Sequence, residues 1–400
     1  MAGALLNGAF IALALVPSIP NFFPRSPRAT TTVRIAVGMH QPGDEKVDTQ
    51  GSVPGIGLFD GDGNRIEFSH PTNKDDIIGD GNKMDIVIPS FDTDNTKPAE
   101  YISISQDGGQ DPICVAYAAV SCADGFSDGS GGTQWKFFGD VAQACGAAWY
   151  HSNLIVPTDS NNEFKPKCVW IGESGGYPQG MAIHMPDFDL GSTAKTQQRI
   201  VDYQNNPDTM CKSTPRWKMW ENLSKFNFIP VFDPPLAYSP DGSDPENIEP
   251  VFQGGVAMGT PGPLDEVTSE QRSSLLMEYY PDAAPGPTWF PSVVGTSYRR
   301  RKLRRSVIDD HVVVSTAKMQ SARELCESET SSGPDFVSTV EGLHCDMEHR
   351  RLRSVCNTTV VHECFDMESN SVRRASGLIA RNDDGVARME KSYRRRLDWS

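Results

Sequence analysis

The segment Gly172-Glu-Ser174-Gly-Gly176 matches the G-x-S-x-G pattern of a serine nucleophile. In α/β-hydrolases this pattern forms a strained turn from strand to helix, which lifts the serine hydroxyl toward a base and an oxyanion hole. The segment is also similar to the one around the nucleophile of chymotrypsin-like proteases. Here Tyr177-Pro178 stands where the helix should begin, and no βαβ alternation precedes the motif. Ser174 is therefore a candidate nucleophile, and an ordinary Gly/Ser turn explains the same residues.

A second segment carries oxygen ligands at alternate positions. Asp60, Asp62 and Asn64 are spaced like the first ligands of a calcium loop. The EF-hand form requires glycine at the sixth position, where Arg65 stands, and no glutamate follows at the twelfth. Because Gly and Asn tolerate positive φ, a tight turn explains the segment better than a calcium site, and we predict no cofactor.

Other acids and histidines form weaker patterns. Glu173, Asp187 and Asp189 are candidates for a glycosidase carboxylate pair, but acids are frequent in this chain. His184 lies in an alternating segment and is predicted to face solvent. Surface positions are also predicted for the three histidines of the cysteine-rich region, His344, His349 and His362. Six tryptophans are predicted to be buried rather than to form a sugar-stacking platform: Trp135, Trp149, Trp170, Trp217, Trp220 and Trp289.

The amino-terminal residues indicate a secreted protein. Residues 5–16 are almost wholly apolar and are followed by Pro17 and Pro20. Twelve residues are too few for a membrane-spanning helix, which needs roughly 20, but they suit a signal peptide cleaved after Ser18. An uncleaved amino-terminal anchor is the alternative. The sequons at Asn222 and Asn357 are candidate glycosylation sites in such a chain.

Secretion favours disulfides for the nine cysteines, which contain no CxxC pair. We expect one free thiol, at Cys122, and pairing within each half of the chain. The sequence leaves the connectivity open, since four cysteines allow three pairings. The predicted disulfide cysteines are Cys114, Cys145, Cys168 and Cys211 before residue 299 and Cys326, Cys345, Cys356 and Cys364 after it.

Charge divides the chain near residue 298. Residues 1–298 hold 18 basic and 36 acidic residues, a net of −18, whereas 299–400 hold 19 and 16, a net of +3. The overall net charge of −15 argues against a nucleic-acid binder. Between the halves, six of the seven residues from Arg299 to Arg305 are basic. Behind a secretory signal such runs suit a subtilisin-type processing protease, with cuts predicted after Arg305 and Arg374. Residues 394–396 repeat the pattern, and an uncut solvated linker is the alternative at 299–305.

The elements that would position these residues are mainly strands. With 35 glycines and 29 prolines the chain favours short strands and turns over helical bundles. Strands are expected at 33–37, 86–88, 101–105, 113–117, 181–185 and 311–315, and hairpin turns at 61–64 and 79–82. The few expected helices are 192–203, one starting at Thr214-Pro215 with Trp217 and Trp220 on one side, 268–279, and 316–326.

We therefore predict an antiparallel β-sandwich with a few peripheral helices and a small, disulfide-stapled carboxyl-terminal module. The expected boundaries are a signal peptide (1–18), the sandwich (30–228), a Pro-rich wrap with one helix (229–298), the basic linker (299–305), the cysteine-rich module (306–370) and a basic disordered tail (371–400).

Several segments resemble a family of uncharacterised secreted proteins of filamentous ascomycete fungi. They include Asp111–Tyr117, Cys145–Tyr150, Lys167–Ile171, Met181–Phe188 and Glu341–Met347. The resemblance implies a fungal, extracellular protein of two parts, in which Cys122 is an additional cysteine, and it supplies no activity or catalytic residue. At the level of fold, the order of strands over 84–149 is similar to a PLAT-type β-sandwich, whose members bind lipid surfaces or protein partners.

These observations predict a non-enzymatic secreted protein that binds an extracellular protein, glycan or lipid surface, as a cell-surface factor or effector. A secreted hydrolase using Ser174 or a carboxylate pair is one alternative. A precursor that releases its carboxyl-terminal part as a toxin-like peptide is the other.

Overall fold

The computed structural model describes fifteen stretches of the chain: residues 22–24, 30–38, 50–69, 76–89, 98–106, 111–122, 134–156, 163–172, 177–188, 194–221, 223–225, 227–232, 235–239, 311–373 and 391–400. The predicted helix at 268–279, Trp289 and the basic run at 299–305 lie outside these residues. Within them, no helix is long and apolar enough to cross a membrane.

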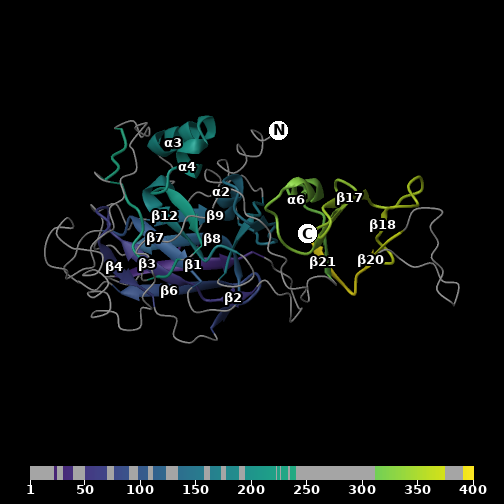
Figure 1. The fold of residues 1–400 in the computed structure, drawn as a ribbon, viewed down its shortest axis with the longest axis horizontal. Coiled ribbons are helices and arrows are strands. Elements are labelled where there is room, and N and C mark those ends of the chain that lie inside the picture. Colours follow the sequence, from purple (N-terminus) through teal and green to yellow (C-terminus); the bar gives the residue numbers. More distant parts are fainter. Residues whose placement is uncertain are drawn as a thin grey trace.

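The amino-terminal part, residues 22–239 and called the body below, contains two antiparallel sheets (Figure 1). The first sheet has the order β10 (Trp149–Tyr150), β11 (Cys168–Ile171), β8 (Ile113–Cys122), β1 (Thr30–Val37) and β6 (Lys83–Pro89), with β9 (Gln134–Phe138) also paired to β8. The second has the order β13 (Trp217–Trp220), β12 (Gly180–His184), β7 (Tyr101–Ser105), β3 (Gly55–Phe59) and β4 (Arg65–Phe68). The predicted mainly β, antiparallel fold is confirmed.

Short elements connect and flank the sheets. A small ladder pairs β2 (Gly51–Ser52) with β5 (Ile77–Ile78). The helical segments are α2 (Gly139–Ala144), the 3₁₀ turn η1 (Met185–Phe188), α3 (Ala194–Asn205) and α4 (Asp208–Cys211). The expected helix at 192–203 is thus confirmed as α3, which begins and ends two residues later.

Alternate residues of the strands belong to different cores. In β11, Val169 and Ile171 join the core between the two sheets, whereas Cys168 and Trp170 join a second core on the outer side of the first sheet. The second sheet behaves likewise, since Met181 of β12 points to the inner core and Ala182 to a third core. Successive strand residues face opposite sides, so β11 and β12 are each covered on both faces.

The cover on the second sheet comes from the segment that follows β13. Leu223, Phe228, Ile229, Val231 and Phe232 are buried there. This corrects the expected boundary at 228, because residues 229–232 belong to the body rather than to a proline-rich wrap.

The expected helix at Thr214 is also wrong: β13 is an edge strand paired to β12 over Gly180–Ile183. Trp217 and Met219 face the inner core and Trp220 the outer one, which is the period of a strand. The Thr-Pro pair stands instead in a turn closed by the Arg216 amide, which donates to the Ser213 carbonyl at 3.1 Å. Pairing with β12 and burial on both sides outweigh the capping signal.

The two Gly-Asp-Gly-Asn turns differ. Residues 61–64 form the predicted hairpin between β3 and β4. Residues 79–82 form a turn closed by the Asn82 amide on the Gly79 carbonyl (3.0 Å), but it joins β5 and β6, which belong to different sheets. The hairpin prediction for the second turn is therefore wrong.

The carboxyl-terminal part, residues 311–373 and 391–400, is called the module below. Its main sheet has the order β17 (Arg351–Ser354), β16 (Leu343–Asp346), β15 (Asp335–Ser338), β14 (His311–Ser315) and β21 (Arg395–Trp399). Helix α6 (Ala322–Glu327) begins at Ser321, whose Oγ accepts from the Glu324 amide at 3.0 Å. A second small sheet joins β18 (Phe365–Asp366), β19 (Ser371–Val372) and β20 (Lys391–Ser392).

The last ten residues are thus ordered strands, which corrects the expected disordered tail for residues 391–400. Strand β21 pairs in parallel with β14 from His311 with Arg395 to Ser315 with Trp399. Leu397 and Trp399 are buried, because this strand points them into the core that the module shares with the body.

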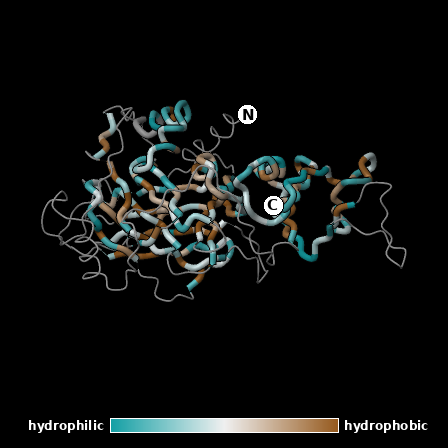
Figure 2. The backbone as a smooth tube through the Cα atoms, viewed as in Figure 1, coloured by the Kyte–Doolittle hydropathy of each residue, from teal (hydrophilic) through white to brown (hydrophobic). Residues whose placement is uncertain are grey.

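That shared core joins the two parts of the chain. The body contributes the outer face of its first sheet, and the module contributes one face of its main sheet, so that the module lies beside the body as a further layer (Figure 1). Figure 2 shows hydrophobic stretches of backbone in the body and in parts of the module. The buried members of the shared core are Cys114, Ala116, Ala148, Trp149, Tyr150, Cys168 and Trp170 of the body and Val313, Ala322, Leu325, Cys326, Phe336, Cys345, Met347, Leu397 and Trp399 of the module.

Candidate functional site

Ser174 lies outside the described residues, but its flanks are described. Strand β11 ends at Ile171, and the Gly172 amide donates to the Pro178 carbonyl at 2.9 Å. The chain then enters β12 at Gly180. The described residues that follow the gap, 177–179, are not helical and lead into β12, whereas a nucleophile elbow needs a helix after the serine. Glu173 and Asp189 also lie outside the described residues.

The candidate calcium loop is a hydrogen-bonded turn. The Asp60 carboxylate accepts from the amides of Asp62 (3.0 Å) and Asn64 (2.8 Å) and from the Asn64 Nδ2 (3.1 Å). Gly63 has a φ of 79°, a value that glycine adopts at no steric cost. The carboxylate thus serves the hairpin, and across the described ranges no three acids, histidines or cysteines are grouped as metal ligands.

The most concentrated set of polar groups in the body surrounds Asp187, in η1. Its Oδ1 accepts from the Tyr203 hydroxyl (2.6 Å), from Arg216 Nη1 (2.8 Å) and from the Tyr238 hydroxyl. Its Oδ2 accepts from His184 Nδ1 at 2.7 Å. The donors come from β12, α3, the residue before β13 and the segment 235–239, so one carboxylate ties four parts of the body together.

The electrostatics of this cluster keep Asp187 ionised. Burial alone would raise its pKa, but the Arg216 guanidinium and His184 outweigh burial and hold the pKa well below its ordinary value. Burial and the nearby carboxylate raise the pKa of Tyr238 well above its ordinary value, so this phenol stays a hydrogen-bond donor.

His184 is fully buried, which corrects the prediction that it faces solvent. Its ring lies between Tyr101, at 4.6 Å between centroids, and Phe232, at 5.6 Å. A His–Asp pair is the geometry of a general base, yet a base must reach the proton it removes. Here aromatic side chains flank the imidazole, and the pair holds buried parts of the body together by hydrogen bonds.

A second cluster links the tail of the chain to the main sheet of the module. Lys391 Nζ lies 2.6 Å from Asp335 Oδ2 and 3.4 Å from Asp346 Oδ1. Tyr393 donates its hydroxyl proton to Asp335, and His344 Nε2 lies 3.0 Å from the Tyr393 oxygen. Because the tyrosine proton goes to Asp335, His344 Nε2 must be the protonated nitrogen that donates to Tyr393.

Burial sets the protonation of this cluster. His344 is fully buried, contrary to the predicted surface position, and its ring stacks on Phe365 at 4.8 Å. Burial, with Arg353 nearby, lowers the pKa of His344 to about 3, so its imidazole is neutral. Burial opposes ionisation of Asp346, but Lys391, the His349 amide and Arg353 lower its pKa to about 2. The cluster fixes residues 391–393 against β15 and β16.

The structure pairs eight cysteines within the two halves: Cys114–Cys168 and Cys145–Cys211 in the body, and Cys326–Cys345 and Cys356–Cys364 in the module. Cys122 is a buried free thiol, and burial raises its pKa. A buried protonated thiol is a poor nucleophile, so Cys122 acts as an apolar side chain in the inner core.

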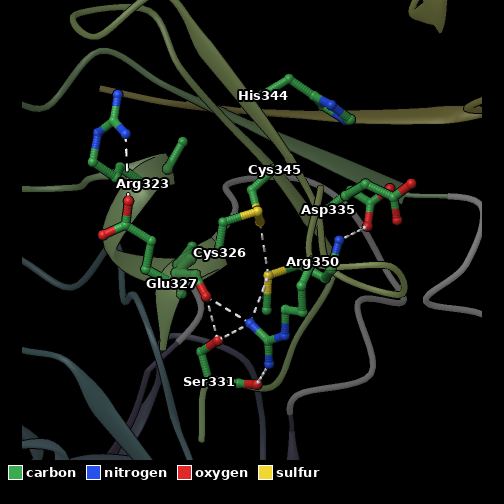
Figure 3. Close-up of a disulfide and its surroundings, with 12 residues drawn as sticks. Arg323, Cys326, Glu327, Ser331, Asp335, His344, Cys345 and Arg350 are labelled. Carbon is green, nitrogen blue, oxygen red and sulfur yellow. Dashed lines mark hydrogen bonds and ion pairs between the residues drawn. A yellow bond between two sulfur atoms is a disulfide. The ribbon is translucent and has the colours of Figure 1, made fainter. Parts of the chain in front are cut away.

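Figure 3 shows how the Cys326–Cys345 disulfide is supported. Arg350 directs its guanidinium at the carbonyl of Leu325 (2.6 Å) and at Ser331. Ser331 in turn forms a β-bridge with Trp149 of the body. The disulfide, the arginine and the contact with the body are therefore parts of one arrangement.

The remaining predicted positions have simple outcomes. Asn357 is exposed in a turn, where its Oδ1 accepts from the amide and hydroxyl of Thr359, both at 2.8 Å. Asn222, Arg305 and Arg374 lie outside the described residues. The five predicted tryptophans that the structure describes are buried, as expected: Trp135, Trp149, Trp170, Trp217 and Trp220.

Sequence reasoning missed two sets of residues. The His184–Asp187 pair has the i, i+3 spacing of a turn, and this signal was available. The contacts that join body and module carry no such signal, because residues such as Lys167 and Glu324 meet only when the two parts dock.

Comparisons of the chain with protein-family models, with curated proteins and with solved structures gave no match. The resemblance to secreted fungal proteins and to the PLAT-type sandwich stays a prediction. What the fold and its polar clusters define is a class: a mainly β protein stapled by four disulfides, in which a sandwich and a smaller module share a core.

Proposed function

We propose that this chain is a secreted fungal binding protein that acts on its partner by surface contact rather than by catalysis. The observation that supports it is the closure of the His184–Asp187 pair, the arrangement closest to a catalytic base. Its carboxylate accepts four hydrogen bonds from the body, and its imidazole is enclosed by Tyr101 and Phe232.

The four disulfides are compatible with an oxidising, extracellular setting. The layered fold suits a scaffold, since β11 and β12 of the sandwich are covered on both faces and the module extends the structure beyond them. The partner class is an extracellular protein, a glycan or a lipid surface.

Two measurements test the proposal on the secreted full chain. A serine-directed activity probe is expected to label wild type and Ser174→Ala equally; labelling that depends on Ser174 would establish the hydrolase instead. Retention is then measured on chitin, on β-glucan and on vesicles containing phosphatidylserine. Saturable binding to one of these, without release of any product, is the expected result. Turnover of a bound polysaccharide or lipid would contradict it.

A further inference from the structure

The outer face of the first body sheet is a docking surface whose occupant is the module. Trp149 and Tyr150 of β10 and Trp170 of β11 are each less than 5 % exposed because the module covers them. The same three side chains donate hydrogen bonds across the boundary: Trp149 to Ser328 Oγ at 2.9 Å, Tyr150 to the Pro334 carbonyl at 2.8 Å and Trp170 to the Ser332 carbonyl at 2.8 Å. Buried aromatic anchors with satisfied polar atoms are typical of tight interfaces.

Backbone and charge add to these anchors. The Ser332 amide donates to the Trp149 carbonyl at 2.8 Å, and Gln320 Nε2 donates to the Ser152 carbonyl at 2.7 Å. Lys167 and Glu324 form an ion pair in which both side chains are largely buried. The Lys165 ammonium donates to the carbonyl of Ser400, so the last residue of the chain also contacts the body.

Body and module are joined by many packing contacts, but no disulfide joins them. Each of the four disulfides joins two cysteines of the same part, and the one remaining cysteine, Cys122, is a thiol. The polypeptide between residues 239 and 311 is therefore the single covalent link from body to module. It contains the basic run Arg299–Arg305.

We propose that hydrolysis within this basic run yields a two-chain protein whose chains stay bound through the docking surface, and not a free carboxyl-terminal peptide. A dibasic-specific protease adds water across one peptide bond, which leaves a carboxylate on the body chain and an ammonium group on the module chain. Neither new terminus removes a contact named above. The inference concerns assembly, so it stands or falls independently of the proposed binding function.

The test begins with the secreted full chain treated with a subtilisin-type dibasic protease. Under denaturing, non-reducing conditions, intact-mass analysis is expected to show the body and the module as separate fragments divided within 299–305, and a cut at the predicted site after Arg374 would add a third fragment. Under native conditions, size-exclusion chromatography with mass detection is expected to show one species of the uncut mass. Separation of the fragments in the native run would overturn the proposal, and so would fragments that stay joined after denaturation without reductant. A basic run that resists the protease, when a peptide of the same sequence is cut, would also overturn the two-chain form.

A matched pair of variants tests the docking surface itself. A Cβ atom at Gly333 would lie 2.3 Å from a ring carbon of Tyr150, and its three nearest atoms all belong to that ring. Gly333→Ala is therefore expected to weaken the cut complex at least tenfold without touching the interior of the module. Combining Gly333→Ala with Tyr150→Ala removes the overlap, so the alanine at 333 should then have little further effect. Val361→Ala, at an exposed position of the module, is the control and should leave the affinity unchanged. Equal affinity for wild type and Gly333→Ala would contradict the assigned surface.

Discussion

The ring of Tyr150 meets the indole of Trp399 edge to face, with centroids 6.4 Å apart and planes at 77°. Tyr150 lies in β10 of the body, and Trp399 is the next-to-last residue of the chain, in β21. On its other side Trp399 packs on Phe336, at 6.0 Å. Trp399 therefore lies in the contact between body and module, where it joins β10, β15 and β21.

Trp399→Ala tests this contact. The indole is 2 % exposed, and deleting a buried tryptophan costs about 3–5 kcal/mol because its cavity is only partly refilled. We expect a loss of that size in the free energy of unfolding, measured with guanidinium chloride. Val361→Ala, at an exposed position, should change it by less than about 0.5 kcal/mol. Equal midpoints for the two variants would show that Trp399 is not part of the core.

The Lys167–Glu324 ion pair gives a second prediction. The two side chains are 15 % and 11 % exposed, so replacing one partner leaves the other charge largely out of water. Glu324→Gln or Lys167→Met should each destabilise the protein by about 2–4 kcal/mol, and the double variant should lose much less than the sum. The exposed pair Arg323–Glu327, on the same helix, is the control, with less than about 0.5 kcal/mol expected. Additive losses at Lys167 and Glu324 would rule out coupling between them.

Local patterns in the sequence are enough to predict much of the fold. The alternating run at 101–105 and the valine run at 311–315 each predicted a strand at its observed bounds, because β-branched residues and turn residues on both sides act locally. The disulfide-bonded cysteines followed from the compartment, but their pairing did not, because Cys114 and Cys168 meet only when β8 pairs with β11.

The errors have a common physical cause. His184 and His344 are predicted at the surface and residues 395–399 in a disordered tail, because a single sequence does not show which face another layer will cover. The Arg394–Arg396 run is strongly polar, yet β21 alternates, so that Leu397 and Trp399 are buried while Arg396 and Asp398 lie on the opposite, more exposed face. Tertiary packing determines that these side chains are buried, and the basic residues determine only the character of the exposed face of β21.

The disulfides should differ in how much each contributes to the free energy of unfolding. Cys114–Cys168 spans 54 residues and is buried in the shared core, whereas Cys356–Cys364 spans 8. In the chain-entropy model the longer loop stabilises by about 2 kcal/mol more. Replacing each pair by alanines should therefore lower the free energy of unfolding more for the first pair than for the second. Equal losses in equilibrium denaturation would contradict this order.

The imidazole of His151 predicts how the contact between body and module responds to acid. Its Nε2 lies 3.1 Å from the Ser321 carbonyl of the module, and its ring packs on Phe336 at 5.2 Å. Burial, reinforced by the nearby Lys167 charge, lowers the pKa of His151 from 6.5 to about 3.

The direction of this pH dependence follows from the linkage between protonation and folding. Between pH 6.5 and 3 the unfolded chain binds a proton at His151 that the folded protein excludes, so folded stability falls as the pH falls. One proton corresponds to about 1.4 kcal/mol per pH unit. Wild type also contains His344, shifted in the same direction, and Glu67 and Asp140, whose raised pKa values of about 7 and about 6 act in the opposite direction, because burial disfavours their ionised forms. The pH dependence of the stability of wild type therefore hides the contribution of His151, and a variant must isolate it.

His151→Gln keeps a donor for the Ser321 carbonyl and removes the titration. We expect the difference in unfolding free energy between wild type and His151→Gln to be constant above pH 7. Between pH 6 and 4 it should shift in favour of the variant by about 1 kcal/mol per pH unit. Chemical denaturation at a series of pH values measures this difference directly. A difference that does not change with pH would mean that His151 takes up its proton equally in the folded and unfolded states, and the closed contact with the module would then be wrong.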